Sequence, residues 1–124
     1  MPLSKYILAV FPNPNALYDI SPEFCITVRT LDKLTIKGIR ATCNADPTAE
    51  LDWDLYYADD FITKANATLI RAMDTTGGEL DTTSGFSNSL ISAGKSIYAA
   101  FSSQPEAAIK QISLQIEYSY EYVF

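Results

Sequence analysis

The sequence predicts an all-β fold: an antiparallel, jelly-roll-like β-sandwich of about eight strands with an extended, Pro-rich N-terminal arm. Apolar and polar residues alternate with period two in several stretches, the pattern of strands with one buried face. Turn-forming pairs of Gly, Pro, Asn and Asp fall between these stretches, several of them about 8–12 residues apart, as in a sandwich or barrel. The chain has 124 residues, 48% of them hydrophobic and 19% charged. One globular domain with a substantial core is therefore expected.

The N-terminal segment differs in composition from the rest. Residues 1–23 contain four of the six prolines. Because proline removes a backbone donor, we predict an extended arm or an added edge strand here, packed on its own domain or on a neighbour. Residues 24–124 are then the β-sandwich domain. No stretch approaches the roughly 18 apolar residues of a membrane span, so no membrane association is expected.

The remaining elements follow the alternation along the chain. The clear strands are residues 24–29, 51–57, 97–101 and 112–122, and shorter candidates are 6–10, 68–72 and 86–91. In residues 34–43 the apolar parity changes at Gly38, which predicts a β-bulge. Segments 58–73 and 104–110 could each hold a short helical turn. The Thr-, Gly- and Asp-rich segment 74–85 is expected to be an exposed connection.

Composition excludes several classes of function. The chain has no histidine, which rules out imidazole-based nucleophile systems and His-ligated metals. A net charge of −6 argues against a nucleic-acid partner, because phosphate neutralisation needs a basic face. We therefore expect no enzyme, no cofactor and no nucleic-acid partner.

The acidic residues between positions 46 and 60 are the densest charged group: Asp46, Glu50, Asp52, Asp54, Asp59 and Asp60. Asp52 and Asp54 share one parity, and paired carboxylates can perform acid–base chemistry or hold Ca²⁺. The spacing lacks the EF-hand pattern. The favoured interpretation is a solvated face that protects a sheet edge from aggregation, with a cation site and catalysis as the alternatives.

Cysteine and tryptophan positions add three expectations. Cys25 and Cys43 lie in apolar stretches, so we expect two buried thiols, with a cross-strand disulfide as the alternative. Trp53 lies on the apolar parity of its strand and should be buried. The one basic group could face an acidic partner or balance the acidic cluster; it comprises Arg29, Lys33, Lys37 and Arg40.

Aromatic residues end the chain in a row of one parity: Tyr118, Tyr120, Tyr122 and Phe124. Tyrosine suits interfaces because it combines a rigid apolar ring with a polar tip. The row is either part of the core or a contact between protomers.

The order of these features resembles a known group of proteins. The segments that carry the likeness are residues 34–41, 51–57, 68–70 and 112–118, together with ISAGKSIY at 91–98. They resemble the small β-sandwich or jelly-roll domains in virion proteins of tailed bacteriophages, among them capsid decoration (cement) proteins, head fibres, and tail-fibre or baseplate modules. The resemblance spans roughly residues 30–122.

The resemblance implies a non-enzymatic structural role and frequent trimers. We expect a homotrimer, made in the host cytoplasm, that binds the major capsid protein or other virion proteins at the capsid surface. The expected interface residues are Tyr118, Tyr120, Tyr122 and Phe124 of the row, and Phe11, Pro12 and Pro14 of the arm. The alternative is a tail, baseplate or fibre module that binds a host receptor or carbohydrate through Trp53 or exposed tyrosine pairs.

Overall fold

The computed structural model describes residues 4–12, 23–43, 52–74, 79–101 and 111–120. These residues form strands and loops, with no helix among them. The strands are β1 (Ser4–Pro12), β2 (Glu23–Thr27), β3 (Leu34–Cys43), β4 (Asp52–Ala58), β5 (Thr68–Asp74), β6 (Glu79–Thr82), β7 (Leu90–Ile91), β8 (Ser96–Phe101) and β9 (Gln111–Tyr120).

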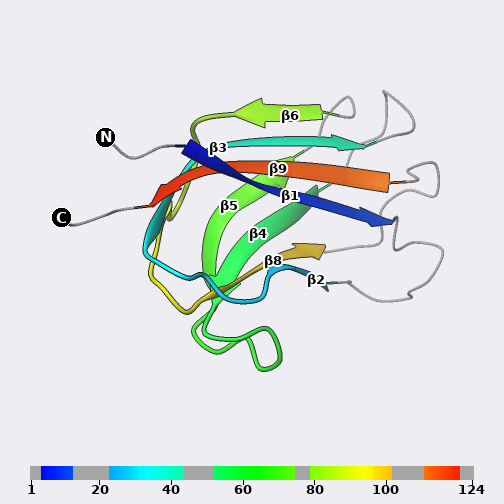
Figure 1. Ribbon diagram of the computed structural model, residues 1–124. Helices are drawn as coiled ribbons and strands as arrows, with labels where there is room; N and C mark the ends of the chain where they lie inside the picture. Colours follow the sequence, from blue (N-terminus) through cyan, green and yellow to red (C-terminus); the bar gives the residue numbers. More distant parts are fainter. Residues whose placement is uncertain (1–3, 13–22, 44–51, 75–78, 102–110, 121–124) are drawn as a thin grey trace.

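The strands form two antiparallel sheets, as the sequence predicted. One sheet has the order β1-β9-β3-β6, with β7 also paired to β3, and the other has the order β2-β8-β4-β5. In Figure 1 the first sheet lies above and the second curves below it. The predicted β-sandwich is therefore confirmed.

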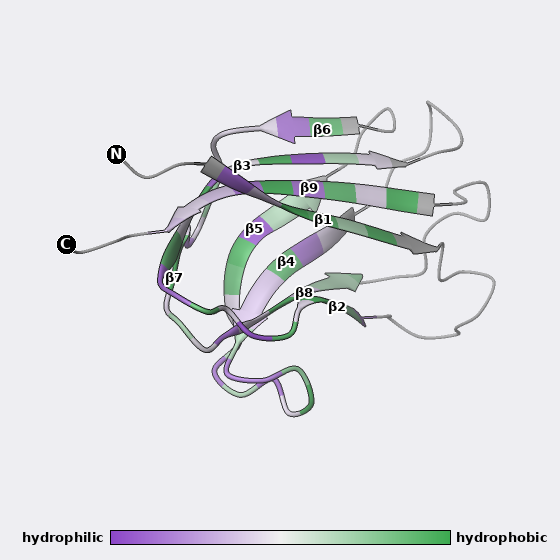
Figure 2. Cartoon of the chain, viewed as in Figure 1, coloured by the Kyte–Doolittle hydropathy of each residue, from purple (hydrophilic) through white to green (hydrophobic). Residues whose placement is uncertain are grey.

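Period-two alternation builds the core between the sheets, and Figure 2 shows hydrophobic and hydrophilic bands alternating along β9. Trp53 is 2% exposed, as expected, and stacks on Phe101 with ring centroids 5.5 Å apart. Burying a side chain such as that of Phe101 contributes roughly 1.5–3 kcal/mol. The other large side chains that are less than 2% exposed are Ile39, Leu55, Ile70, Met73, Ile91, Ile97, Ile112 and Ile116.

The β-bulge predicted at Gly38 is confirmed. The register between β3 and β9 shifts between Ile36 and Gly38. The extra residue lets Ile36 and Ile39 both face the core although they differ in parity. A Cβ at Gly38 would lie 3.4 Å from the Thr82 carbonyl oxygen, so a glycine here also permits the close approach of β6.

Three sequence predictions need correction. Residues 79–82 form β6 inside the expected connection, because they pair with β3 beyond the bulge although only Leu80 is apolar. The strand expected at 86–91 is reduced to the two residues of β7. Segment 58–73 contains no helix: after β4 it forms a loop with turns, and then β5, which confirms the strand expected at 68–72 and pairs with β4. Residues 104–110 lie outside the described part of the chain.

The N-terminal segment contributes an edge strand over its described part. All nine residues of β1 pair with β9, from Ser4 opposite Ser119 to Pro12 opposite Gln111. Ile7 and Ala9 pack against the core. Residues 13–22 lie outside the described ranges. Within those ranges, no helix of the length and hydropathy needed to cross a membrane is found.

Candidate interaction surfaces

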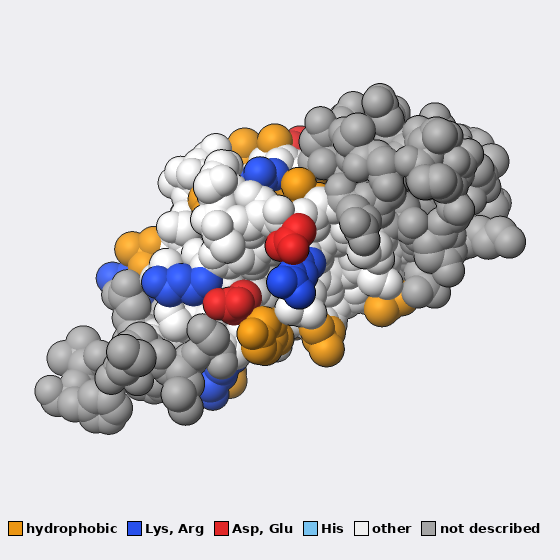
Figure 3. Space-filling model, turned by 90° about the horizontal axis from the view of Figure 1, so that it is seen from above, with side chains coloured by type: hydrophobic (Ala, Val, Ile, Leu, Met, Phe, Trp, Pro, Cys, Tyr) orange, Lys and Arg blue, Asp and Glu red, His pale blue; other side chains and the backbone are white. Residues whose placement is uncertain are grey.

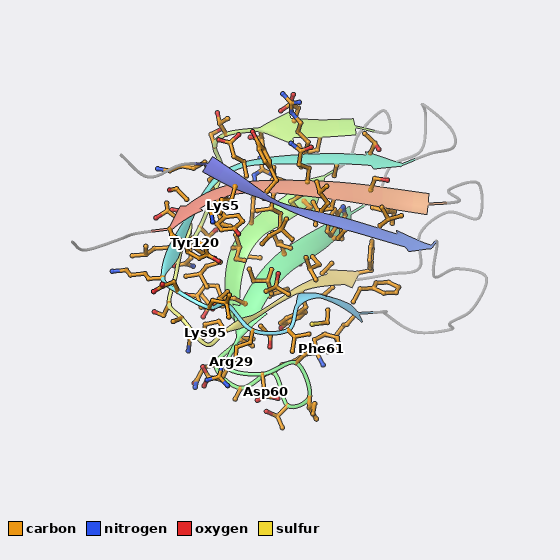
Figure 4. All side chains as sticks on the ribbon, viewed as in Figure 1. Lys5, Arg29, Asp60, Phe61, Lys95 and Tyr120 are labelled. Carbon is orange, nitrogen blue, oxygen red and sulfur yellow. The ribbon has the colours of Figure 1, made fainter. Side chains whose placement is uncertain are left out.

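The described part of the aromatic row lies on the core side of β9. Tyr118 is only 9% exposed and belongs to the core cluster. Tyr120 is half-buried and meets Tyr118 edge-to-face, with ring centroids 5.3 Å apart. The Lys5 ammonium lies 5.3 Å from the centroid of the Tyr120 ring, a cation–π contact that links the start of β1 to the end of β9 (Figure 4).

The other expected interface residues are only partly visible. Phe11 and Pro12 belong to β1, where they pair with Ile112 and Gln111. Their side chains lie outside the described structure, as do Pro14, Tyr122 and Phe124 entirely. An interface role for this set therefore stays a prediction.

Three apolar side chains on β1 face solvent instead of the core: Tyr6, Leu8 and Val10, which are 54%, 72% and 64% exposed. We call them the β1 row. In register beside them on β9 stand Glu117, Gln115 and Ser113. The β1 row is thus an apolar strip at the border of the first sheet.

Next to the β1 row is a hollow of about 120 Å³, lined in part by Tyr6, Gly38 and Glu117. Across it, Arg40 Nε lies 3.3 Å from Asp81 Oδ1, and both side chains are about two-thirds exposed. An exposed pair of this kind contributes roughly 0–1 kcal/mol. Figure 3 shows how basic and acidic groups mix on the face seen from above. The hollow is well below the few hundred Å³ of typical ligand pockets.

A second apolar surface lies at one end of the sandwich, where the loop between β4 and β5 meets the end of β2. Val28 and Ile62 are 81% and 91% exposed. Together with Phe61 and Cys25 they line an open groove of about 450 Å³. We call these four residues the loop-end patch. Figure 4 shows Phe61, Arg29, Asp60 and Lys95 at this end of the molecule, and Arg29 and Asp60 line the groove with Phe61.

Carboxylates hold the loop that carries Ile62. Asp60 accepts hydrogen bonds from the backbone nitrogen and the hydroxyl of Thr63, both at 2.6 Å. Asp59 accepts one from Asn66 Nδ2 at 2.7 Å and forms an ion pair with Lys95. The bond from Lys95, then that from Asn66, lowers the pKa of Asp59, and the Thr63 hydroxyl lowers the pKa of Asp60.

Lys64 completes the loop. Its ammonium lies 4.7 Å from the Phe61 ring centroid, 5.9 Å from that of Tyr98 and 3.3 Å from Glu23 Oε1. Lys64 and Asn66 both have positive φ angles, of 53° and 54°. Non-glycine residues adopt this left-handed conformation at a cost, and it persists where surrounding contacts fix it. The loop therefore has a defined shape that presents Ile62 to solvent.

Thr30 ties the β2–β3 connection to the turn before β8. Its backbone nitrogen donates to the Lys95 carbonyl oxygen, and its own carbonyl oxygen accepts from the Gly94 nitrogen, both at 2.8 Å. Its hydroxyl donates to the Ser92 carbonyl oxygen and accepts from the Lys95 nitrogen, both at 2.9 Å. Gly94 has a φ of 81°, which favours glycine. The ISAGKSIY segment is thus a hydrogen-bonded turn, and sequence reasoning missed Thr30 as its partner.

The acidic cluster is divided among local contacts. Asp54 accepts a hydrogen bond from the Tyr56 hydroxyl at 3.5 Å, whereas Asp59 and Asp60 shape the loop. Burial, and then the charge of Asp54, raises the pKa of Tyr56. Among described residues, no three Asp, Glu or Cys side chains gather as metal ligands would. Asp46 and Glu50, and the side chain of Asp52, lie outside the described structure.

The cysteine expectation is wrong for Cys25, whose thiol is free and exposed. Partial burial still raises its pKa. Its neighbours Phe24 and Ile26 pack against the core, so the alternation along β2 turns Cys25 to the opposite face, where it lines the groove. The side chain of Cys43 lies outside the described structure. Of the basic group, Arg40 pairs with Asp81 on β6, not with the acidic cluster.

Sequence reasoning missed both apolar surfaces, although β1 carried a signal. Residues 6–10 are apolar at both parities. A strand with one solvent-facing side should alternate, so apolar residues on both sides indicate a second contact. Ile62 stood in a segment without periodicity and gave no comparable signal.

Comparisons with known proteins bear on the fold. No protein-family model and no curated protein sequence matches the chain. Among solved structures, a chain of the capsid of Ralstonia phage GP4 superposes with a TM-score of 0.62 and 11% identity, covering 99% of this chain and 86% of that one. A chain of the acidic-stable capsid of Helicobacter pylori bacteriophage KHP30 superposes with a TM-score of 0.50 and 11% identity, covering 98% and 91%. The sandwich fold is thus one also found in chains of two phage capsids.

Proposed function

We propose that the chain is a non-enzymatic structural component of a bacteriophage virion, which decorates and stabilises the capsid by bridging major capsid protein subunits. One observation carries the proposal: the match to the phage GP4 capsid chain extends over 99% of this chain and 86% of that one. The capsid chain is therefore little more than one sandwich of this size. Because a fold alone does not determine function, the surfaces must also suit the role.

The loop-end patch suits a protein partner. Its aliphatic side chains, Val28 and Ile62, are exposed to solvent. Ile62 lies on a loop of defined shape, so it can enter a pocket without further ordering of the chain. Two ion pairs lie beside it, Asp59 with Lys95 and Lys64 with Glu23. Docking an apolar surface here would leave those pairs intact at the rim. Interfaces are built in this way, with an apolar centre and a polar border.

The remaining parts of the proposal concern assembly. Many copies on one shell make weak contacts effective through avidity. The homotrimer, the position at the capsid surface and synthesis in the host cytoplasm are expectations from the resemblance. An acidic surface is compatible with the role because the partner is protein.

The test begins with particles released from the cells that carry the gene. Mass spectrometry should find the chain in purified particles at a fixed ratio to the major capsid protein. Immunogold labelling should place it on the head. Particles that lack the chain should lose their DNA at lower temperature, and purified chain added back should restore their stability. Absence from the particles would contradict a virion role.

Labelling on the tail would instead support the receptor- or carbohydrate-binding alternative. That alternative no longer has Trp53 as a stacking platform, because the ring is buried against Phe101. Tyr56 is also engaged, stacked on Tyr98 with ring centroids 5.5 Å apart. A glycan screen with the purified chain, which we expect to be negative, tests it directly.

A further inference from the structure

We propose that β1 pairs with β1 of a second copy of this chain, antiparallel, about a two-fold axis at Leu8. The proposal concerns the free protein and does not depend on a capsid role. It rests on the position of β1 in the sheet, on the β1 row and on the symmetry of the strand sequence.

The position of β1 leaves one side of its backbone open. β1 stands at the end of the order β1-β9-β3-β6, and within the described residues only β9 pairs with it. Native proteins commonly protect such edges with charged side chains, prolines, bulges or short strands. β1 is nine residues long and pairs with β9 without a register shift. Its one charged residue, Lys5, and its one proline, Pro12, stand near its two ends, so residues 6–11 between them carry neither.

The side chains of β1 fit a further contact. Ile7 and Ala9 pack on the core, so Tyr6, Leu8 and Val10 point to the opposite face of the strand. If that face contacted only water, polar residues would be expected at these three positions. They are instead apolar and more than half exposed. Single exposed apolar residues are ordinary, but a row of them along an open strand edge marks an interaction site.

The strand is complementary to itself in one register. Leu8 is the middle residue of Ser4–Pro12, so an antiparallel pair centred on it aligns all nine residues. Tyr6 then faces Val10 of the second copy, and Leu8 faces Leu8. Aromatic–β-branched and aliphatic cross-strand pairs of this kind stabilise a sheet. Lys5 faces Phe11 rather than another lysine.

Charge also favours this contact between copies. Each chain carries a net charge of −6, so two copies repel each other over most of their surfaces. β1 contains no acidic residue, and the nearest carboxylate on β9, Glu117, stands one strand behind it, opposite Tyr6. Identical patches that satisfy each other form a closed two-fold pair, which leaves no β1 edge open for further growth.

The first experiment measures the absolute mass of the purified chain by light scattering over a wide range of concentrations. We expect a concentration-dependent dimer of about twice 13.7 kDa. Leu8→Lys places two ammonium groups face to face on the axis, so the dissociation constant should rise about tenfold or more. Leu31→Lys is the matched control: Leu31 is 85% exposed but lies in the connection after β2, and its variant should dimerise like the parent chain.

The second experiment tests the register by oxidation in a Cys25→Ser, Cys43→Ser background. Leu8→Cys should form an intermolecular disulfide, because directly opposed strand residues lie about 4.5–5.5 Å apart at Cα. Tyr6→Cys should not, because its two copies would be offset by four residues, about 13 Å along the strand. Circular dichroism confirms that each variant keeps its β-sheet content.

The outcomes separate cleanly. Dimers that Leu8→Lys disrupts, and that Leu8→Cys but not Tyr6→Cys cross-links, support the pairing. A parent chain that stays monomeric at every concentration overturns it, as does a trimer or a dimer that Leu8→Lys leaves unchanged. Because no capsid is present, these results are independent of the proposed virion role, although a dimer would contradict the homotrimer expected from the resemblance.

Discussion

The β1 row and the loop-end patch both expose aliphatic side chains, but their backbones differ. At the edge of β1, no described strand other than β9 pairs with the backbone, which can therefore accept a further strand. At the loop end the backbone is engaged within its own loop: Thr63 N donates to Asp60, and Asp59 N donates to the Ala65 carbonyl oxygen. An edge strand with free backbone hydrogen-bonding groups can bind a partner strand in a given register. A loop whose backbone is already hydrogen-bonded can instead bind a pocket of complementary shape. One molecule can therefore use the first surface for self-association and the second for a different protein.

The largest expected effect separates the two surfaces by function. Ile62→Asp places a charge where an apolar contact is proposed, and we expect the affinity for capsids to fall by about 2 kcal/mol or more, roughly thirtyfold. The measurement is co-sedimentation with particles stripped of the chain. The mass of the free protein should not change.

A matched control keeps that experiment interpretable. Leu31→Asp introduces the same charge at another exposed aliphatic residue that does not line the groove. Its capsid affinity should stay close to that of the parent chain. Equal losses in both variants would mean that added charge, not the loop-end patch, controls binding.

The next effect concerns what supports the loop end. Thr30→Val removes the hydroxyl that joins the Ser92 carbonyl oxygen to the Lys95 nitrogen, at a residue that is 4% exposed. Both backbone groups then lose a partner, so the free energy of unfolding should fall by about 1–3 kcal/mol. Urea unfolding measures it, with the exposed Thr42→Val as control. The proposed dimer through β1 should persist in this variant under native conditions, because Thr30 lies in the connection between β2 and β3, whereas β1 pairs with β9.

Sequence reasoning succeeded where one side of a strand is buried. The alternation along β9, the parity change at Gly38 and the burial of Trp53 were all predictable. A strand with one buried and one exposed face requires apolar and polar residues to alternate with period two. β6 was missed because four residues with a single apolar side chain carry no period, and the sheet edge made by β3 determines their conformation.

The candidate surfaces were less predictable for a related reason. An apolar residue that contacts a partner cannot be distinguished in the sequence from one that packs in the core. The β1 row therefore appears in the sequence as an ordinary apolar stretch. The exposed position of Ile62 depends on the contacts that fix its loop. These include the hydrogen bond between Asn66 and Asp59 and the ion pair between Asp59 and Lys95. The parity of the terminal aromatic row left core and interface both open for Tyr118, and the fold places it in the core.

A smaller effect is expected at Gly94. Its φ of 81° is left-handed, and an added Cβ would lie 3.7 Å from Arg29, an ordinary contact. The cost of Gly94→Ala is therefore conformational, and we expect a loss of about 1–2 kcal/mol in unfolding free energy. Ala93→Gly, at the neighbouring position, serves as the control for altered backbone freedom. An unchanged denaturation midpoint in Gly94→Ala would show that the turn does not depend on this conformation.

The smallest effect is on acid stability, and it again distinguishes the two surfaces. The pKa of Asp60 lies below its ordinary value of 3.8 because the Thr63 hydroxyl and backbone nitrogen bind the carboxylate. A lowered folded-state pKa means that the stabilisation is present above the unfolded-state value and is lost as pH falls through the folded-state value. Asp60→Asn should therefore flatten the acid side of the profile of unfolding free energy against pH. Because β1 itself carries no carboxylate, the matched acid profile of Leu8→Lys should keep the slope of the parent chain. If the pH profile of Asp60→Asn runs parallel to that of the parent chain, the Asp60 carboxylate does not help to hold Ile62 in place.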